Sequence, residues 1–259
     1  NFRDINVTIN NSIDPLPFWV DRMAGLLYIN KTSYGIPYIY YDDVTAANYS
    51  NMGTTFLRND SFDNLTVGDL NTQNGWSGGA IFDVQSSVMQ NGTQSVEHLG
   101  GTTSISKSIP QGQNYSVIFY INMSDTTRSA YVYFYEGATE IIRVGMDGGM
   151  FVDNVGTFGS TIINRWYMFQ VNITSSGHDI FIYNQSNISA VSVAGRANVN
   201  PMTTGIDTIT LQTYTIGEDS YFDTIGLWIP TYPKAVIGSW GIENLVTTVG
   251  VTRYNNYTL

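Results

Sequence analysis

The most constraining feature of the chain is a succession of short, strand-like runs between Asn114 and Tyr183. All are rich in β-branched and aromatic residues, and each is closed by Gly, Asn, Asp or Ser. The runs cover residues 116–122 (SVIFYIN), 130–135 (AYVYFY), 166–174 (WYMFQVNIT) and 179–183 (DIFIY). Successive runs of this kind indicate the strands of an antiparallel sandwich. The pattern therefore predicts an all-β fold.

Two of these runs predict which side chains face the core. Side chains alternate between the two faces of a strand. In residues 130–135, Ala, Val and Phe share one face, and Tyr131, Tyr133 and Tyr135 share the other. In residues 166–174, the aliphatic and aromatic face consists of Phe169, Val171 and Ile173.

The length and the turn signals predict three segments. We expect a small N-terminal β unit over residues 1–57, a main sandwich over residues 58–230 and a strand-like C-terminal extension over residues 231–259. The wide strand spacing in the main segment favours a large jelly roll over a compact immunoglobulin-type sandwich. No apolar run is long enough to span a membrane. Because the first residue is Asn1 rather than Met, either a signal peptide has been removed or the chain is part of a longer precursor.

The C-terminal extension has strand composition in residues 235–240 (AVIGSW) and 245–252 (LVTTVGVT). A strand beyond a finished sandwich needs a pairing partner, because an unpaired strand edge invites association. One interpretation is that the extension folds back on the N-terminal unit. The other is that it adds to the sheet of a neighbouring copy and builds a filament or lattice.

Charge and residue usage exclude several classes of function. The net charge is −10 and only 12% of residues are charged, which argues against a nucleic-acid partner because such partners require a basic patch. The chain has no cysteine, so disulfides and thiolate chemistry are excluded. With only two histidines and no cysteine, a zinc site is not expected.

Asn-X-Ser/Thr sequons are dense. A sequon is only a potential glycan acceptor, and an Asn- and Thr-rich chain contains some by accident, but the roughly five expected by chance are well exceeded. We therefore expect an extracellular, N-glycosylated protein. The sequons lie at Asn6, Asn10, Asn30, Asn48, Asn59, Asn64, Asn91, Asn114, Asn122, Asn172, Asn184, Asn187 and Asn256.

Several stretches resemble a known combination of domains. Residues 2–11, 16–20 (LPFWV) and 38–48 resemble a domain of unknown function that is common in archaeal surface proteins and usually precedes a concanavalin A-like (laminin G-like) sandwich. Residues 60–63 (DSFD), 164–167 (NRWY) and 221–228 (YFDTIGLW) look like the opening strand, the Trp-Tyr strand and the closing strand of that sandwich. The resemblance covers roughly residues 1–230. It implies a concanavalin A-like jelly roll, whose members bind sugars, serve in adhesion or hydrolyse polysaccharides.

The same resemblance implies a structural calcium ion, because sandwiches of this kind often hold one where the opening and closing strands meet. Asp63 and Asp223 lie at the matching positions, and calcium requires oxygen ligands. The alternative is that both are ordinary surface or turn aspartates. No cofactor is required by any other pattern in the chain.

The residues do not predict an enzyme. Glycosidases of this superfamily place two or three carboxylates on one strand, and the chain lacks that motif. Glu136 and Glu140 flank a predicted hairpin, and Glu218 precedes Asp219 directly. Residues 75–79 (GWSGG) match the letters of a nucleophile elbow, but no strand precedes them and no helix follows, and only His98 or His178 could act as base. We interpret them as a glycine-rich turn.

The best candidate for a binding surface is the set Tyr131, Tyr133 and Tyr135, with Trp166 joining from a neighbouring strand. Aromatic rings stack on sugar faces, and their hydroxyls donate hydrogen bonds. The alternative is that these rings pack under a loop, against the N-terminal unit or against another subunit.

Taken as a whole, the sequence favours an extracellular structural or adhesive subunit of a surface filament, surface layer or virion appendage that associates with copies of itself through strand and aromatic contacts. The alternative is a carbohydrate-binding recognition or attachment module. A polysaccharide hydrolase is the least favoured function.

Overall fold

The computed structural model describes residues 6–9, 18–21, 26–29, 37–40, 52–184, 187–214 and 220–229. The chain divides into two compact units, Asn1–Leu57 with Pro230–Leu259, and Arg58–Ile229. The predicted extension over residues 231–259 lies outside the described residues, so both interpretations of it stay predictions. Among the helices described, none has the length and apolar character that crossing a membrane requires.

The described part of the first unit is built from short strands. Strand β1 (Asn6–Ile9) pairs with β4 (Pro37–Tyr40), and β2 (Phe18–Asp21) pairs with β3 (Leu26–Ile29), both antiparallel. A single helical turn, α1 (Met52–Thr55), follows. The ring of Trp19 meets the ring of Phe56 edge to face at 5.5 Å, and both side chains are buried. The described strands are those of a β unit, and the predicted bounds of an N-terminal unit over residues 1–57 stay a prediction.

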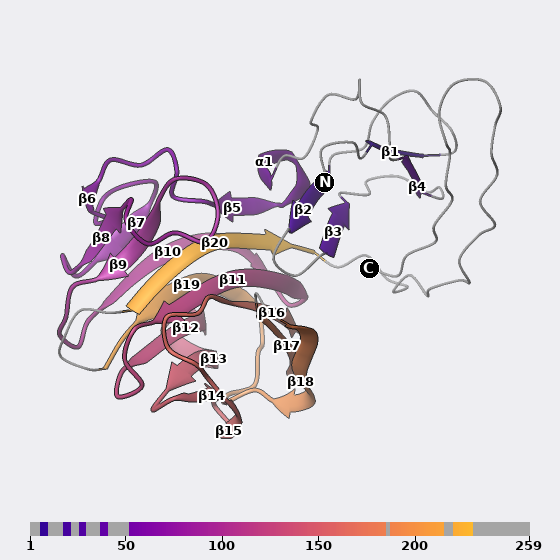
Figure 1. Cartoon of the computed structure of the whole chain (residues 1–259). Helices are drawn as coiled ribbons and strands as arrows, with labels where there is room; N and C mark the ends of the chain where they lie inside the picture. The colour runs from indigo at the N-terminus through magenta and orange to yellow at the C-terminus, as the bar shows by residue number, and fades with distance from the viewer. Residues whose placement is uncertain are drawn as a thin grey trace. The chain divides into compact units, whose positions relative to one another are not determined.

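The second unit is a sandwich of two antiparallel sheets (Figure 1). The seven-stranded sheet has the order β15 (Thr157–Ser160), β14 (Met150–Asp153), β13 (Thr139–Asp147), β12 (Ser129–Glu136), β19 (Ile206–Gln212), β10 (Ser104–Gly112) and β7 (Trp76–Gly78). The nine-stranded sheet has the order β18 (Asn187–Ala197), β17 (Gly177–Asn184), β16 (Tyr167–Ile173), β11 (Tyr115–Met123), β20 (Ser220–Trp228), β9 (Ser95–His98), β8 (Phe82–Gln85) and β6 (Gly68–Asp69), and β5 (Arg58–Asp60) also pairs with β20.

The core lies between the two sheets and follows the predicted alternation. Phe119 of β11 stacks on Phe169 of β16 with ring centroids 5.1 Å apart, and it also meets Phe134 of the opposite sheet at 6.4 Å. The predicted core-facing residues of β12 and β16 all belong to this cluster: Ala130, Val132, Phe134, Phe169, Val171 and Ile173. Alternation therefore assigned both faces of these strands correctly.

Strand β20 changes partner halfway along its length. Residues 220–222 pair with β9, whereas residues 225–227 pair with β5. Between them Thr224 has a left-handed φ of 45°, which local structure must hold because it is unfavourable for a β-branched residue. The predicted opening and closing strands are therefore neighbours, and Asp223 lies where the partner changes.

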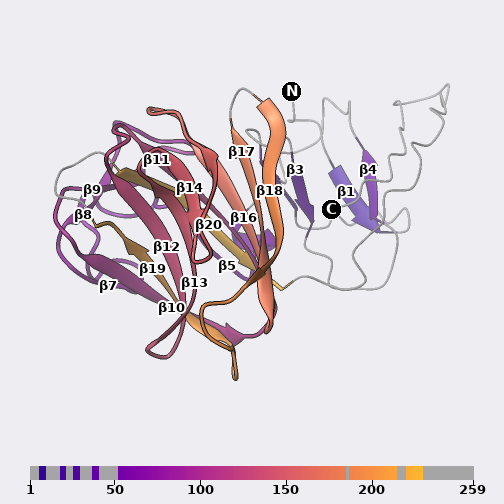
Figure 2. The ribbon, with the colours of Figure 1, turned by 90° about the horizontal axis from the view of Figure 1, so that it is seen from below.

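The two sheets end next to each other at one side of the sandwich. Edge strands β15 and β18 meet there, since a Cβ atom on Gly159 would lie 3.5 Å from Val191 Cγ1. Figure 2 shows β17 and β18 as a long hairpin at this edge. Close approach of the edges brings polar residues of both sheets together there.

Candidate functional site

The predicted tyrosines lie together on the outer face of the seven-stranded sheet, the face that points away from the core. Tyr131, Tyr133 and Tyr135 of β12, here called the tyrosine ladder, form a cluster separate from the main core, with Val152 and Met150 of β14 packed beside them. The pattern follows from period-two alternation, because the residues between the tyrosines fill the core.

The rings of the ladder pack on one another. Tyr133 and Tyr135 are stacked with centroids 5.9 Å apart and an interplanar angle of 15°. Tyr131 is tilted against Tyr133, also at 5.9 Å. Tyr214, which follows β19, meets Tyr131 edge to face at 5.6 Å, and its hydroxyl is hydrogen-bonded to the Tyr133 hydroxyl.

Exposure differs sharply along the ladder. Tyr131 and Tyr133 are 6% and 1% exposed, whereas Tyr135 is half-buried and Tyr214 is 45% exposed. The first two rings are therefore mainly packing residues, and Tyr135 and Tyr214 supply the accessible aromatic surface. Sequence reasoning missed Tyr214, because the residue lies outside any alternating run.

Arg143 contacts the ladder from β13, which flanks β12 on the side opposite β19. Register places Arg143 directly opposite Tyr133. Its guanidinium carbon lies 5.7 Å from the Tyr131 ring centroid and 6.0 Å from that of Tyr133, within cation–π range. Glu140 forms an ion pair with it at 4.0 Å. Burial raises the pKa of Tyr131, Tyr133 and Tyr135, so all three hydroxyls stay protonated donors at ordinary pH.

A row of hydroxyl side chains runs beside the ladder across β19 and β10. Register places Tyr133 opposite Thr210, Thr210 opposite Ser106, and Ser106 opposite Ser77 of β7. Ser106 Oγ and Thr210 Oγ1 are 2.8 Å apart and share a hydrogen bond. Thr208 lies opposite Tyr135 in the next row. The outer face thus combines aromatic rings with hydroxyl groups along the same strands.

Trp166 does not join this surface. It lies directly before β16, which belongs to the nine-stranded sheet, and only 5% of its surface is exposed. The ladder is on β12 of the other sheet. The structure therefore does not bring Trp166 and the tyrosines together.

The predicted calcium ligands are brought to one loop. Asp63 Oδ1 accepts hydrogen bonds from the backbone amides of Thr93 and Gln94, at 2.5 and 3.0 Å. Asp223 Oδ2 accepts bonds from the amides of Gln90 and Asn91, at 2.8 and 3.0 Å. The two carboxylates therefore hold opposite ends of the loop over residues 90–94.

At this loop, the carboxyl group of Asp223 has a strongly shifted pKa. Burial raises the pKa of Asp223 to about 7, against the hydrogen bonds that lower it, and the nearby charge of Asp63 adds to the rise. Gly92 has a φ of 70°, and a Cβ atom there would lie 2.1 Å from Asp63 Oδ2, so only glycine fits. Two coupled carboxylates fit a divalent cation in charge, although backbone amides already occupy one oxygen of each.

The acidic residues considered for catalysis have structural partners. Glu136 Oε1 accepts hydrogen bonds from the backbone amides of Thr203, Thr204 and Gly205 and from both threonine hydroxyls. These bonds, led by that from the Thr204 hydroxyl, lower the pKa of Glu136 to about 2. Glu218 lies outside the described residues.

Residues 75–79 do not form a nucleophile elbow. Trp76–Gly78 are strand β7 at the edge of the seven-stranded sheet, so the expected turn is partly an edge strand. Gly78 has a φ of 151°, and a Cβ atom there would lie 2.5 Å from the Ser104 carbonyl oxygen, which explains the glycine. His98 pairs with Thr213 and His178 with Asn198, so the described structure couples neither to Ser77.

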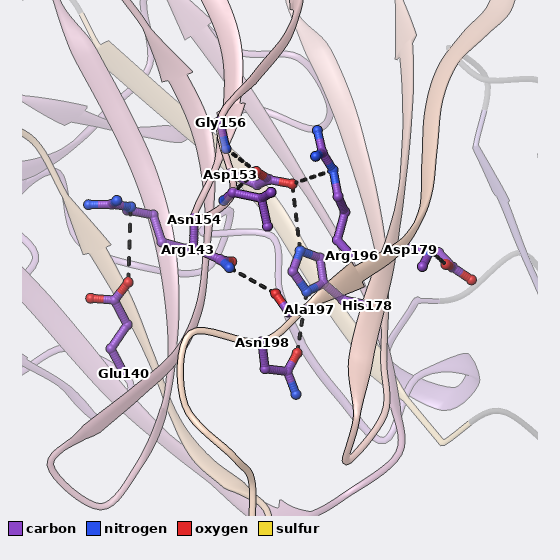
Figure 3. A network of polar contacts seen from close by, with 12 residues as sticks. Glu140, Arg143, Asp153, Asn154, Gly156, His178, Asp179, Arg196, Ala197 and Asn198 are labelled. Atoms are coloured by element: carbon purple, nitrogen blue, oxygen red, sulfur yellow. Dashed lines mark hydrogen bonds and ion pairs between the residues drawn. The ribbon is translucent and has the colours of Figure 1, made fainter.

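A buried polar network joins the two sheets at their adjoining edges (Figure 3). Asp153 of β14 lies 3.1 Å from Nε of Arg196 on β18 and 3.8 Å from Nε2 of His178 on β17. Its Oδ1 accepts the amides of Val155 and Gly156. Burial acts to raise the pKa of Asp153, but these partners outweigh it and hold the pKa below its usual value. The network therefore works as an ionic cross-link.

Comparisons with known proteins identify the fold. No family model and no curated protein matches the chain, so the resemblance of residues 1–57 to archaeal surface proteins stays a prediction. Among solved structures, lectin II from Ulex europaeus matches with a TM-score of 0.50 and 7% identity over 67% of this chain and 98% of the lectin. A sialidase matches with a TM-score of 0.50 and 13% identity over 77% of this chain, which spans only 21% of the sialidase. The second unit is a concanavalin A-like jelly-roll sandwich.

Proposed function

We propose that the Arg58–Ile229 sandwich is a carbohydrate-binding recognition module and that its ligand lies on the outer face of the seven-stranded sheet. The observation that carries this proposal is the half-buried ring of Tyr135, stacked on Tyr133 beside the hydroxyl of Thr208. The apolar face of a sugar ring stacks on an aromatic ring, while neighbouring hydroxyls bond to its rim.

The buried part of the ladder prepares this surface for binding. Tyr133 is held by Tyr214 through a hydrogen bond and by Arg143 through its guanidinium. A ring that is fixed before the ligand arrives loses little freedom on binding, so more of the contact energy appears as affinity. Tyr131 and Tyr133 position the accessible rings, and Tyr135 and Tyr214 contact the ligand.

The proposed ligand is a neutral glycan. Arg143 is the cation beside the ladder, and Glu140 already neutralises it. The chain as a whole carries a net charge of −10, which repels anionic sugars. Uronic acids and sulfated glycans are therefore disfavoured, and neutral sugars with an exposed apolar face are favoured.

A structural calcium ion at Asp63 and Asp223 is part of the proposal. The two carboxylates would hold the ion, which would neutralise their mutual repulsion and fix the loop over residues 90–94. The proposed ion is structural and takes part in no reaction. The carboxylates of Asp63 and Asp223 already anchor the loop by accepting hydrogen bonds from its backbone amides.

The carbohydrate-binding proposal takes precedence over the assembly subunit favoured by the sequence alone. The assembly interpretation rests on the dense sequons and on the strand-like residues 231–259, and the described residues do not include the latter. The matched protein from Ulex europaeus is by its name a lectin, and this supports sugar recognition on the shared fold. An extracellular location accords with both functions.

A glycan array probed with the full chain tests the proposal. We expect binding to a set of neutral glycans that Tyr135→Ala abolishes and that Tyr183→Ala leaves unchanged. Tyr183 is the matched control because it is also half-buried but lies on β17 of the other sheet. Absence of binding by the unmodified chain, or release of reducing sugar from the glycans, would contradict a pure recognition module.

A further inference from the structure

The sequons are distributed unevenly between the two sheets of the sandwich. The strands of the nine-stranded sheet contain five asparagines, and every one begins a sequon: Asn59, Asn122, Asn172, Asn184 and Asn187. The seven strands of the other sheet contain no asparagine, although each contains serine, threonine or both except β14. Sequons are therefore missing from the seven-stranded sheet because asparagine is missing.

We propose that N-glycans are attached at exposed turns, at Asn64, Asn91 and Asn114, and that the outer face of the seven-stranded sheet is kept free of them. The donor is a lipid-pyrophosphate-linked oligosaccharide. The asparagine Nδ2 forms a bond to the anomeric carbon, the bond from that carbon to the lipid pyrophosphate breaks, and Nδ2 loses one proton. A cellular oligosaccharyltransferase supplies the catalysis.

The three acceptors have the environment that a glycan requires. Asn64, Asn91 and Asn114 are exposed and lie in loops between strands. None of their side-chain amides makes a hydrogen bond within the described part of the chain, so Nδ2 is available in each. A bulky, hydrophilic chain attached there extends into solvent without displacing any packed group.

Asn122 has the opposite environment and stays unmodified. It lies on β11 between β16 and β20, opposite Tyr221, and only 6% of its surface is exposed. A glycan cannot leave the sheet from this position without displacing the side chains that bury Asn122. Burial therefore separates sequons that look identical in the sequence.

The glycan-free face coincides with the tyrosine ladder. A glycan on β19 at the position of Thr208 would lie directly beside Tyr135, because the two residues are cross-strand neighbours. The absence of acceptors keeps that surface open to a partner. This inference rests on the positions of asparagines and does not depend on the proposed carbohydrate function.

Site-resolved mass spectrometry of glycopeptides tests the inference. The full chain is secreted from a cell line that attaches N-glycans, and the folded product is digested and mapped. We expect glycans at Asn64, Asn91 and Asn114 and unmodified Asn122. A glycan on Asn122 of folded protein, or an unmodified amide at any of the three exposed sites, would overturn the proposal.

An engineered sequon tests whether the outer face is accessible to the oligosaccharyltransferase and lacks glycans only because its strands lack asparagine. Ser106→Asn creates a sequon with Ser108, and the same change combined with Ser108→Ala removes it again. We expect the single variant to gain one glycan and the double variant to gain none. If the single variant is secreted folded but unglycosylated, the face is shielded by other means and the proposal fails. This readout needs no ligand, so it is independent of the glycan-array result.

Discussion

The hydroxyl groups of Tyr133 and Tyr214, 81 positions apart in the chain, share a hydrogen bond on the outer face of the seven-stranded sheet. This bond ties the loop after β19 to the middle of β12. Tyr133 is 1% exposed, and its ring is held by packing, by the Arg143 guanidinium and by this bond. The accessible residues Tyr135 and Tyr214 thus both contact the buried Tyr133.

Substitution of Tyr133 should therefore affect stability more than that of Tyr135. Tyr133→Ala is expected to lower the free energy of unfolding by about 3–5 kcal/mol, because it removes a buried aromatic ring. Tyr133→Phe should cost about 1 kcal/mol, the usual net value of one hydrogen bond. Urea unfolding of the variants measures both. Equal losses for Tyr133→Ala and Tyr135→Ala would contradict this division of roles.

Removing one partner of the ionic cross-link between the sheets should destabilise the protein more than replacing both partners. Arg196→Ala leaves the Asp153 carboxylate, whose side chain is 0% exposed, without its cation and should cost about 3 kcal/mol. The double variant Asp153→Asn with Arg196→Ala should be less destabilised than Arg196→Ala alone, because no unpaired buried charge remains. Additive losses in this double-mutant cycle would show that the two side chains do not interact.

Alternation and turn signals were sufficient to predict the scaffold. The core-facing residues of β12 and β16 could be named because every second residue is apolar, and the tyrosines could be assigned to the opposite face for the same reason. The all-β jelly roll follows from many such strands. The pairing of the opening and closing strands was implied by the family resemblance.

The site could be predicted only in part, because it depends on contacts between distant residues. Nothing local marks Tyr214 as a partner of Tyr133, or Arg143 as a neighbour of two rings. The sequence places Trp166 on a strand that could neighbour the ladder, but sheet order separates them. The Asp153 network, formed by three strands of two sheets, has no signal in the sequence.

His98 should make the protein sensitive to acid. The imidazole is 1% exposed and shares a 2.6 Å hydrogen bond with Thr213, and burial lowers its pKa from 6.5 to about 4. Between these two values the unfolded chain binds the proton more readily than the folded chain. Stability due to this residue is therefore complete above pH 6.5 and falls by about 1.4 kcal/mol per pH unit down to about pH 4.

Thermal unfolding between pH 4 and pH 7 tests this sign. The difference in stability between the unmodified chain and His98→Gln should grow as the pH rises, because the variant lacks the titrating ring. A difference that is constant over this range, or that shrinks as the pH rises, would show that His98 is not held neutral by burial.

Calcium should stabilise the fold if Asp63 and Asp223 hold an ion, and above the dissociation constant the gain should grow with the logarithm of the calcium concentration. At about 100 times the dissociation constant, the expected gain is about 2.7 kcal/mol, seen as a rise in Tm that chelator reverses. Asp63→Asn should abolish the rise, and Asp147→Asn, an exposed aspartate at the end of β13, should not. Magnesium at the same concentration serves as the control ion. An identical Tm with calcium and with chelator would remove the ion from the account.

Calorimetric titration of a neutral glycan selected on the array into the unmodified chain, Tyr135→Ala and Tyr183→Ala decides whether the ligand lies on the tyrosine ladder. We expect Tyr135→Ala to raise Kd at least about tenfold, equivalent to about 1.4 kcal/mol, and Tyr183→Ala to bind as the unmodified chain does. An unchanged Kd for a folded Tyr135→Ala variant would show that the glycan binds elsewhere and would contradict the assignment of the outer face of the seven-stranded sheet as the recognition surface.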